Sequence, residues 1–180
     1  RLGMVPVPIQ IPIGSEEKFQ GVIDLIARRA WFFSGDRDDP PVEGEIPAEY
    51  VGDAERWRDT MLERIAEKDE QIMLSYLEGH EVSVDEIRKA IRRGTNANNF
   101  TPVLCGSALK NVGVRRVLDA VIDYLPSPVD VPPVTGHRSN GETVERSAAD
   151  SEPLSALTFK IVTDPFVGRL AYVRVYSGSL

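Results

Sequence analysis

Residues 6–13 restrict the fold of this chain more than any other stretch of its sequence. Apolar residues alternate there in the period-2 pattern of a half-buried strand, and prolines occupy the opposite parity at Pro6, Pro8 and Pro12. Amide hydrogens also alternate sides along a strand, so the edge that carries the prolines keeps only the Gln10 donor. Because that edge can hardly pair with a neighbour, the segment is predicted to be an outer strand.

Short strands and helices are expected after this segment. Strands are predicted at residues 21–26 and 30–33, followed by an acidic loop at 34–44. Three helices should follow, one behind Pro47 with apolar residues at helical spacing (Ala54, Trp57, Met61 and Ile65). Asp69 can cap the second, which should end at Gly79. Ser83 and Glu86 form the capping box of a third, which is predicted to end at Gly94.

A strand, a loop and a helix make up residues 100–125. The strand at 100–105 leads into the loop 106–111, and the helix carries an apolar stripe (Val114, Val117, Leu118, Val121, Ile122 and Leu125). This unit is typical of the last turn of an α/β domain. A proline-rich connector follows, with an Asn140–Gly141 turn that would suit a small hairpin. Two final strands, at 154–163 and 169–176, do not bury enough apolar surface to stand alone, so they should belong to a larger β domain.

The charge is unevenly distributed. Of the net charge of −7, residues 43–86 contribute −10, with fourteen Asp or Glu against four Lys or Arg. An acidic block repels phosphate backbones, so it favours either a docking face for a basic protein or a plain solvated surface. The single cysteine, Cys105, excludes an internal disulfide and fits a reducing, cytoplasmic compartment. No run approaches the roughly 18 apolar residues of a membrane span.

Two groups of residues are candidates for a site. Ser107, Ala108 and Leu109 follow a strand at the end where ligands bind in open α/β sheets, and exposed amides there could hold a purine edge. An ordinary βα loop would also account for them. The second group is an acidic stripe with a spacing of four on the first helix (Glu55, Asp59, Glu63 and Glu67). Like charges at this spacing destabilise a helix, partly offset by Arg58 and Arg64 nearby, which suggests a partner or else a solvated face.

Enzymatic chemistry is poorly supported by the residues. His80 and His137 lack metal-ligand spacing, and Cys105 lies within an apolar strand. The sequence contains no Gly-x-x-x-x-Gly-Lys-Ser/Thr phosphate loop, which a nucleotide hydrolase of that class needs.

Taken in order, several short motifs resemble elongation factor G, the bacterial-type ribosomal translocase. They are RLG at 1–3, PVPIQIPIG at 6–14, GVIDLI at 21–26, YLEG at 76–79, IRRGT at 91–95, PVLCGSALKN at 102–111, LDAVIDYLPSP at 118–128, TDPFVGRL at 163–170 and RVYSG at 174–178. Each motif is modest alone, but their succession is specific and covers most of the chain.

The resemblance implies an α+β and α/β chain in four parts. Residues 1–98 would form the G-prime insert, 99–128 the closing strand and helix of the GTPase domain, 129–153 a linker and 154–180 the first strands of a β-barrel. In the family's guanine-binding motif, Ser107 would brace the loop, the Ala108 amide would donate to guanine O6 and Leu109 would cover the base plane. Many small GTPases have lysine at this third position.

The resemblance also implies partners. The family docks a helix of the insert on the C-terminal domain of the ribosomal stalk protein, for which Glu55, Asp59, Glu63 and Glu67 are our candidates, and its barrel contacts small-subunit rRNA. The phosphate loop, the Mg²⁺-binding switch elements and the Asn-Lys-x-Asp motif are missing from this sequence. The chain is therefore expected to be a non-catalytic part of a GTP- and Mg²⁺-dependent translation GTPase. Ribosome-protection and release-factor-recycling GTPases, or a stand-alone acidic interaction module, are the alternatives.

Overall fold

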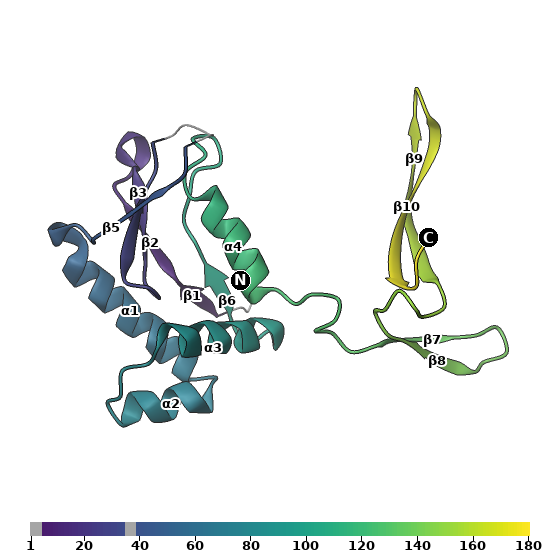
Figure 1. The fold of residues 1–180 in the computed structure, drawn as a ribbon, viewed down its shortest axis with the longest axis horizontal. Coiled ribbons are helices and arrows are strands. Elements are labelled where there is room, and N and C mark those ends of the chain that lie inside the picture. The colour runs from purple at the N-terminus through teal and green to yellow at the C-terminus, as the bar shows by residue number, and fades with distance from the viewer. Residues whose placement is uncertain (1–4, 35–38) are drawn as a thin grey trace. The chain divides into compact units, whose positions relative to one another are not determined.

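The chain is an α+β protein that divides into two compact units, Arg1–Leu125 and Pro126–Leu180. A computed structural model describes residues 5–34 and 39–180 (Figure 1). The RLG motif at 1–3 and residues 35–38 of the predicted acidic loop lie outside the described residues. No helix in the described ranges is both long and apolar enough to cross a membrane.

The proline-rich segment serves two sheets. It forms β1 (Pro6–Pro8) and β2 (Gln10–Ile13) instead of one continuous strand. β1 pairs in parallel with β6 (Thr101–Val103), and the Ile9 amide donates to the Val103 carbonyl at 3.0 Å. β2 lies at the end of a four-stranded sheet in the order β2-β3-β4-β5, so its predicted outer position is confirmed.

The remaining strands of this sheet are β3 (Gly21–Asp24), β4 (Arg29–Phe32) and β5 (Val42–Gly44). All pair antiparallel, and β5 lies within the stretch predicted as loop. That prediction was wrong for Val42–Gly44, because backbone pairing with β4 makes the strand and the three residues carry no period-2 pattern. A short 3₁₀ turn, η1 (Glu16–Lys18), connects β2 to β3.

Three α-helices follow the sheet, as predicted. After the 3₁₀ turn η2 (Ala48–Tyr50) come α1 (Val51–Ala66), α2 (Glu70–Leu77) and α3 (Val84–Asn96). The Asp69 carboxylate accepts from the Ile72 amide at 3.2 Å and caps α2. Both hydrogen bonds of the Ser83–Glu86 capping box are present at the start of α3.

The third helix does not end at Gly94. It continues to Asn96, and Gly94 lies buried inside it. The ring of Phe100 occupies the space beside its Cα, where an added Cβ would lie 2.2 Å from a ring carbon. Gly94 is therefore needed to make room for the Phe100 ring, and the prediction that α3 ends at this glycine was wrong.

The hydrophobic core of the first unit lies between β1, β2, β3, β4 and the three helices. The largest completely buried side chains are Ile13, Ile23, Leu25, Met61, Ile65, Ile72, Ile87 and Ile91. They come from both β-strands and helices, so the elements of residues 5–104 depend on each other for their burial.

The last helix of this unit, α4 (Val114–Tyr124), packs against α3. The Arg92 guanidinium on α3 donates to the carbonyls of Ile122 and Asp123 at 3.2 and 2.8 Å. Arg116 lies over the Trp31 ring at 3.8 Å, which adds a cation–π contact. The predicted apolar stripe of α4, however, is largely exposed, with Leu118 58% and Ile122 76% accessible.

The second unit consists of two antiparallel hairpins. β7 (Val134–His137) pairs with β8 (Thr143–Arg146), which confirms the hairpin predicted at Asn140–Gly141, where Gly141 has a φ of +85°. β9 (Ser155–Asp164) pairs with β10 (Gly168–Ser177). The unit begins at Pro126, inside residues 99–128, which the resemblance assigns to the closing strand and helix of a GTPase domain.

Candidate functional site

The loop between β6 and α4 is closed by Ser107. Its backbone exchanges two hydrogen bonds with Val112, of 2.8 and 3.0 Å, which form an isolated β-bridge. Inside this bridge the Lys110 amide donates to Ser107 Oγ at 3.3 Å, and the Asn111 amide donates to the Ala108 carbonyl at 3.2 Å. The turn from Ser107 to Val112 is thus defined by its own hydrogen bonds.

Two glycines allow the ends of this loop to meet. A Cβ on Gly106 would lie 2.8 Å from the Val112 carbonyl oxygen, and one on Gly113 would lie 2.8 Å from the Cys105 carbonyl oxygen. Gly113 also has a φ of +79°, a region that other residues rarely adopt. Side chains at these two positions would push the chain segments apart and change the shape of the turn.

The tip of the loop is open to solvent. Ala108 and Leu109 are both exposed, and Leu109 is 97% accessible. The Ala108 amide makes no hydrogen bond to any residue that the structure describes. A free N–H beside a small side chain can donate to a carbonyl oxygen of a ligand, and the isobutyl group of Leu109 can cover a flat apolar face.

The charged side chain of this loop, Lys110, contacts another element of the structure. The Lys110 ammonium donates to the backbone carbonyl of Glu16 at 3.1 Å, so it is engaged with η1. No group of three or more His, Cys, Asp or Glu side chains among residues 5–34 and 39–180 could hold a metal ion.

Cys105 precedes the loop and is half-buried. Burial raises the pKa of its thiol to about 11, since desolvation penalises the thiolate. A thiol with this pKa is almost entirely protonated at neutral pH and is a poor nucleophile. Its position fits a packing role under the loop.

The four carboxylates of the acidic stripe lie together on the solvent face of α1. Glu55, Asp59, Glu63 and Glu67 are all solvent-accessible, while the helix buries a neighbouring face through Ala54, Met61, Leu62, Ile65 and Ala66. The predicted spacing therefore produces one continuous acidic face, which we call the α1 acidic face.

The expected compensation by Arg58 and Arg64 is not formed as ion pairs. The Arg58 guanidinium donates to the carbonyls of Leu25 and Ile26, and that of Arg64 donates to the carbonyl of Pro6. Within the described residues, the face has one ion pair, between Glu55 and Arg28 at 3.7 Å. The side chains of Asp59 and Glu67 form no hydrogen bond or ion pair with a described residue, so most of this negative charge is uncompensated.

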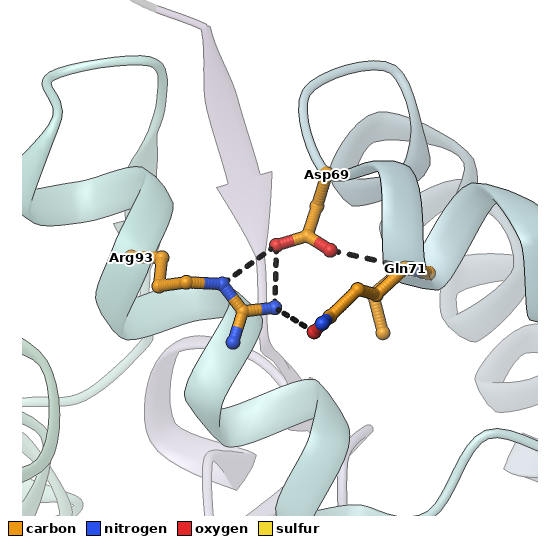
Figure 2. Close-up of polar contacts among 4 residues, drawn as sticks. Asp69, Gln71 and Arg93 are labelled. Atoms are coloured by element: carbon orange, nitrogen blue, oxygen red, sulfur yellow. Dashed lines mark hydrogen bonds and ion pairs between the residues drawn. The ribbon is translucent and has the colours of Figure 1, made fainter.

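A third polar cluster, formed by Asp69, Gln71 and Arg93, was not predicted from the sequence. Figure 2 shows Asp69 at the start of α2 accepting a two-pronged contact from Arg93 of α3, with Nε at 3.0 Å and Nη2 at 2.7 Å from Oδ2. Nη2 also donates to Gln71 Oε1 at 3.2 Å. The other Asp69 oxygen caps α2. Only the capping role of Asp69 had a local signal, because Arg93 lies on another helix.

The structure does not join the two predicted groups into one site. No hydrogen bond or ion pair in the described residues links the 107–109 loop to the α1 acidic face. They belong to separate elements of the first unit (Figure 1), so each has to be considered as a contact surface of its own.

Comparison with known proteins identifies a similar structure without a stated function. No protein-family model matches the chain. The crystal structure of ttk003000868 from Thermus thermophilus is similar over 96% of this chain, with a TM-score of 0.71 and 30% sequence identity. The chain spans 23% of that protein's length. The same arrangement of elements thus occurs as a minor part of a larger protein.

Proposed function

We propose that this chain is part of a GTP-binding translation elongation factor of the elongation factor G type, and that it does not itself hydrolyse GTP. The observation that carries the proposal is the β6–α4 loop, whose exposed Ala108 amide has no partner among the described residues. In this proposal the amide donates to guanine O6, Leu109 covers the base and Ser107 holds the turn closed.

Two further features support the proposal. The motif order of elongation factor G extends over most of the chain, and the similar Thermus thermophilus protein contains this arrangement within a much longer chain. The Mg²⁺ and phosphates of the nucleotide would be held by residues outside this sequence, since it contains no phosphate loop. Catalysis would accordingly depend on the rest of the protein.

The base contact can be tested by NMR titration of the 180-residue chain. GDP at millimolar concentration is expected to shift the amide resonances of Ala108 and Leu109, whereas ADP should leave them in place, because adenine carries an amino group where guanine has O6. The same sample should release no phosphate from GTP. Equal shifts with ADP, or GTP turnover that survives repurification, would contradict the proposal.

The α1 acidic face is proposed to dock on the C-terminal domain of the ribosomal stalk protein. Reversing three charges (Glu55→Lys, Asp59→Lys and Glu63→Lys) should weaken binding at least tenfold at low salt, because complementary charges at the interface become repulsive. Isothermal titration calorimetry measures the affinity.

A matched control has the same change in net charge at exposed acidic residues elsewhere (Glu17→Lys, Glu145→Lys and Asp150→Lys). This control should keep most of the affinity. An equal loss in both variants would mean that net charge alone determines binding. If the triple variant on α1 kept the original affinity, the α1 acidic face would be a solvated surface without a docking role.

A further inference from the structure

The second helix, α2, exposes four large apolar side chains to solvent. Of its eight residues only Ile72 is buried, while large apolar side chains are accessible at Met73 (41%), Leu74 (59%), Tyr76 (41%) and Leu77 (75%). At 100° per residue these four occupy one continuous arc of the helix. We call them the α2 apolar patch. Single exposed hydrophobic residues are common, but a contiguous group on one short helix marks a contact surface.

The patch borders the α1 acidic face. The Tyr76 hydroxyl donates to Glu63 Oε1 at 3.5 Å, which places the edge of the patch beside a carboxylate of the face. Desolvation and then the charges of Glu63 and Asp59 raise the pKa of Tyr76, as expected for a phenol next to anions. The two surfaces are therefore parts of one larger surface formed by α1 and α2.

The orientation of α2 is fixed from its other side. Asp69, whose side chain is only 9% exposed, is held by Arg93 of α3 and also caps the helix (Figure 2). Ile72 anchors the buried side of α2 in the core. Because the helix is held at its first turn and along its inner side, the patch is presented in a defined position next to α1.

We propose that the α2 apolar patch and the α1 acidic face form a single docking surface for a protein that presents an apolar ridge flanked by lysine or arginine. This inference rests on the proposed function, in which that partner is the stalk protein's C-terminal domain. It adds that α2 carries the contact that holds the complex together, while the carboxylates of α1 guide the approach.

The local charge of the surface and the relative strengths of ionic and apolar contacts favour a protein partner of this kind. Nucleic acid is disfavoured by the local charge of −10 over residues 43–86, and a second copy of this chain would place two acidic faces together. Exposed ion pairs each contribute little to affinity, whereas apolar side chains buried at the centre of an interface dominate it. Charges at the rim mainly change the association rate and its salt dependence.

The experiment measures association and dissociation rates with the stalk protein's C-terminal domain immobilised on a sensor surface. Leu74→Ser with Leu77→Ser should raise the dissociation rate roughly tenfold with little change in the association rate. The three charge reversals on α1 should mainly lower the association rate and reduce its dependence on salt. The control, Leu118→Ser with Ile122→Ser, removes comparably exposed leucine and isoleucine side chains from α4 and should change neither rate.

The outcomes separate this inference from the function on which it rests. If the chain binds and the charge reversals weaken it, but the α2 variant dissociates at the original rate, the inference is overturned and the proposed function stands. The α2 side chains are exposed, so the variant should keep the native circular dichroism spectrum and unfolding midpoint.

If the stalk domain does not bind, the proposed partner is wrong, and the docking surface is then tested with a second probe. A synthetic helical peptide with a leucine stripe between lysines should shift the amide resonances of residues 59–67 and 73–77 of the chain. Absence of these shifts, or shifts confined to α4 or to β9 and β10, would overturn the inference. Self-association in sedimentation experiments that disappears in the Leu74→Ser, Leu77→Ser variant would show that a second copy is the occupant, and would overturn it as well.

Discussion

At the scale of single residues, Gly94 decides how the end of α3 meets the start of β6. Glycine is the poorest helix former except proline, costing about 1 kcal/mol relative to alanine. Here the absence of a side chain lets the Phe100 ring lie against the helix backbone, and Phe100 itself is 3% exposed. The packing of this ring offsets a local disadvantage of the helix.

We expect Gly94→Ala to destabilise the protein by about 1–3 kcal/mol, although alanine is the better helix former, because the new methyl would overlap the buried ring of Phe100. Urea unfolding followed by circular dichroism measures the change. Gly52→Ala is the matched control, since it lies in α1 with nothing within 4 Å of the added Cβ and should leave stability equal or slightly higher. A Gly94→Ala variant as stable as the original would mean that Phe100 is not tightly packed.

At the scale of elements, local signals defined the helices better than the strands. Asp69 and Ser83 each cap a helix through hydrogen bonds to a residue three positions further along the chain, so these caps could be predicted from the sequence. β5 is a strand because Val42–Gly44 pairs with β4. The segment 6–13 divides into β1 and β2 because β6, which is distant in sequence, pairs with β1 alone. Contacts of this range leave no local pattern.

The candidate site follows the same rule. The 107–109 loop and the stripe on α1 were predictable because each is a short local pattern on one element. The contact of Arg93 with Asp69 and the exposure of Leu74 and Leu77 depend on how α2 lies against α1 and α3.

The capping box of α3 gives a prediction for pH. The Ser83 hydroxyl and then the Ser83 amide, by hydrogen bonding to the carboxylate, lower the pKa of Glu86 below its ordinary 4.5. A carboxylate with a lowered pKa in the folded state stabilises the fold above its unfolded pKa and loses this contribution as the pH falls through the folded value. The capping box should therefore contribute fully at pH 7 and progressively less below about pH 4.5.

Ser83→Ala should lower stability by about 1 kcal/mol at pH 7, the usual cost of a lost N-cap, and the difference should narrow on acidification through the Glu86 titration. Urea unfolding at a series of pH values measures the difference in stability. The pKa of Glu86, followed by NMR, should be higher in the variant, because the hydrogen bond from the Ser83 hydroxyl is lost. Ser15→Ala is the control, because Ser15 precedes η1 without a side-chain capping bond. A difference that stays constant down to pH 3 would show that the Glu86 carboxylate does not take part.

At the scale of the whole molecule, the two units differ in what they bury. The first unit contains all of the buried apolar side chains in the described ranges. In the second, described throughout as residues 126–180, only Ser177 is buried, and the apolar residues of β9 and β10 are exposed (among them Leu157, Phe159, Ile161, Tyr172 and Val173). Isolated hairpins are at best marginally stable in water, so the second unit has little to hold it in this arrangement.

Native-state hydrogen exchange should therefore divide the chain at Leu125. Amides of β3 and α3 belong to the cooperative core and should exchange only at rates set by global unfolding, whereas the hydrogen-bonded amides of β9 and β10 should exchange orders of magnitude faster, through local opening. The comparison is made by NMR at several protein concentrations. Slow exchange in β10 that persists on dilution would contradict this account, since a hairpin with both faces in water has no means of protecting its amides. Slow exchange that appears only at high concentration would mean that the exposed strands pair between molecules, because unpaired strand edges and apolar faces are then covered by a neighbour.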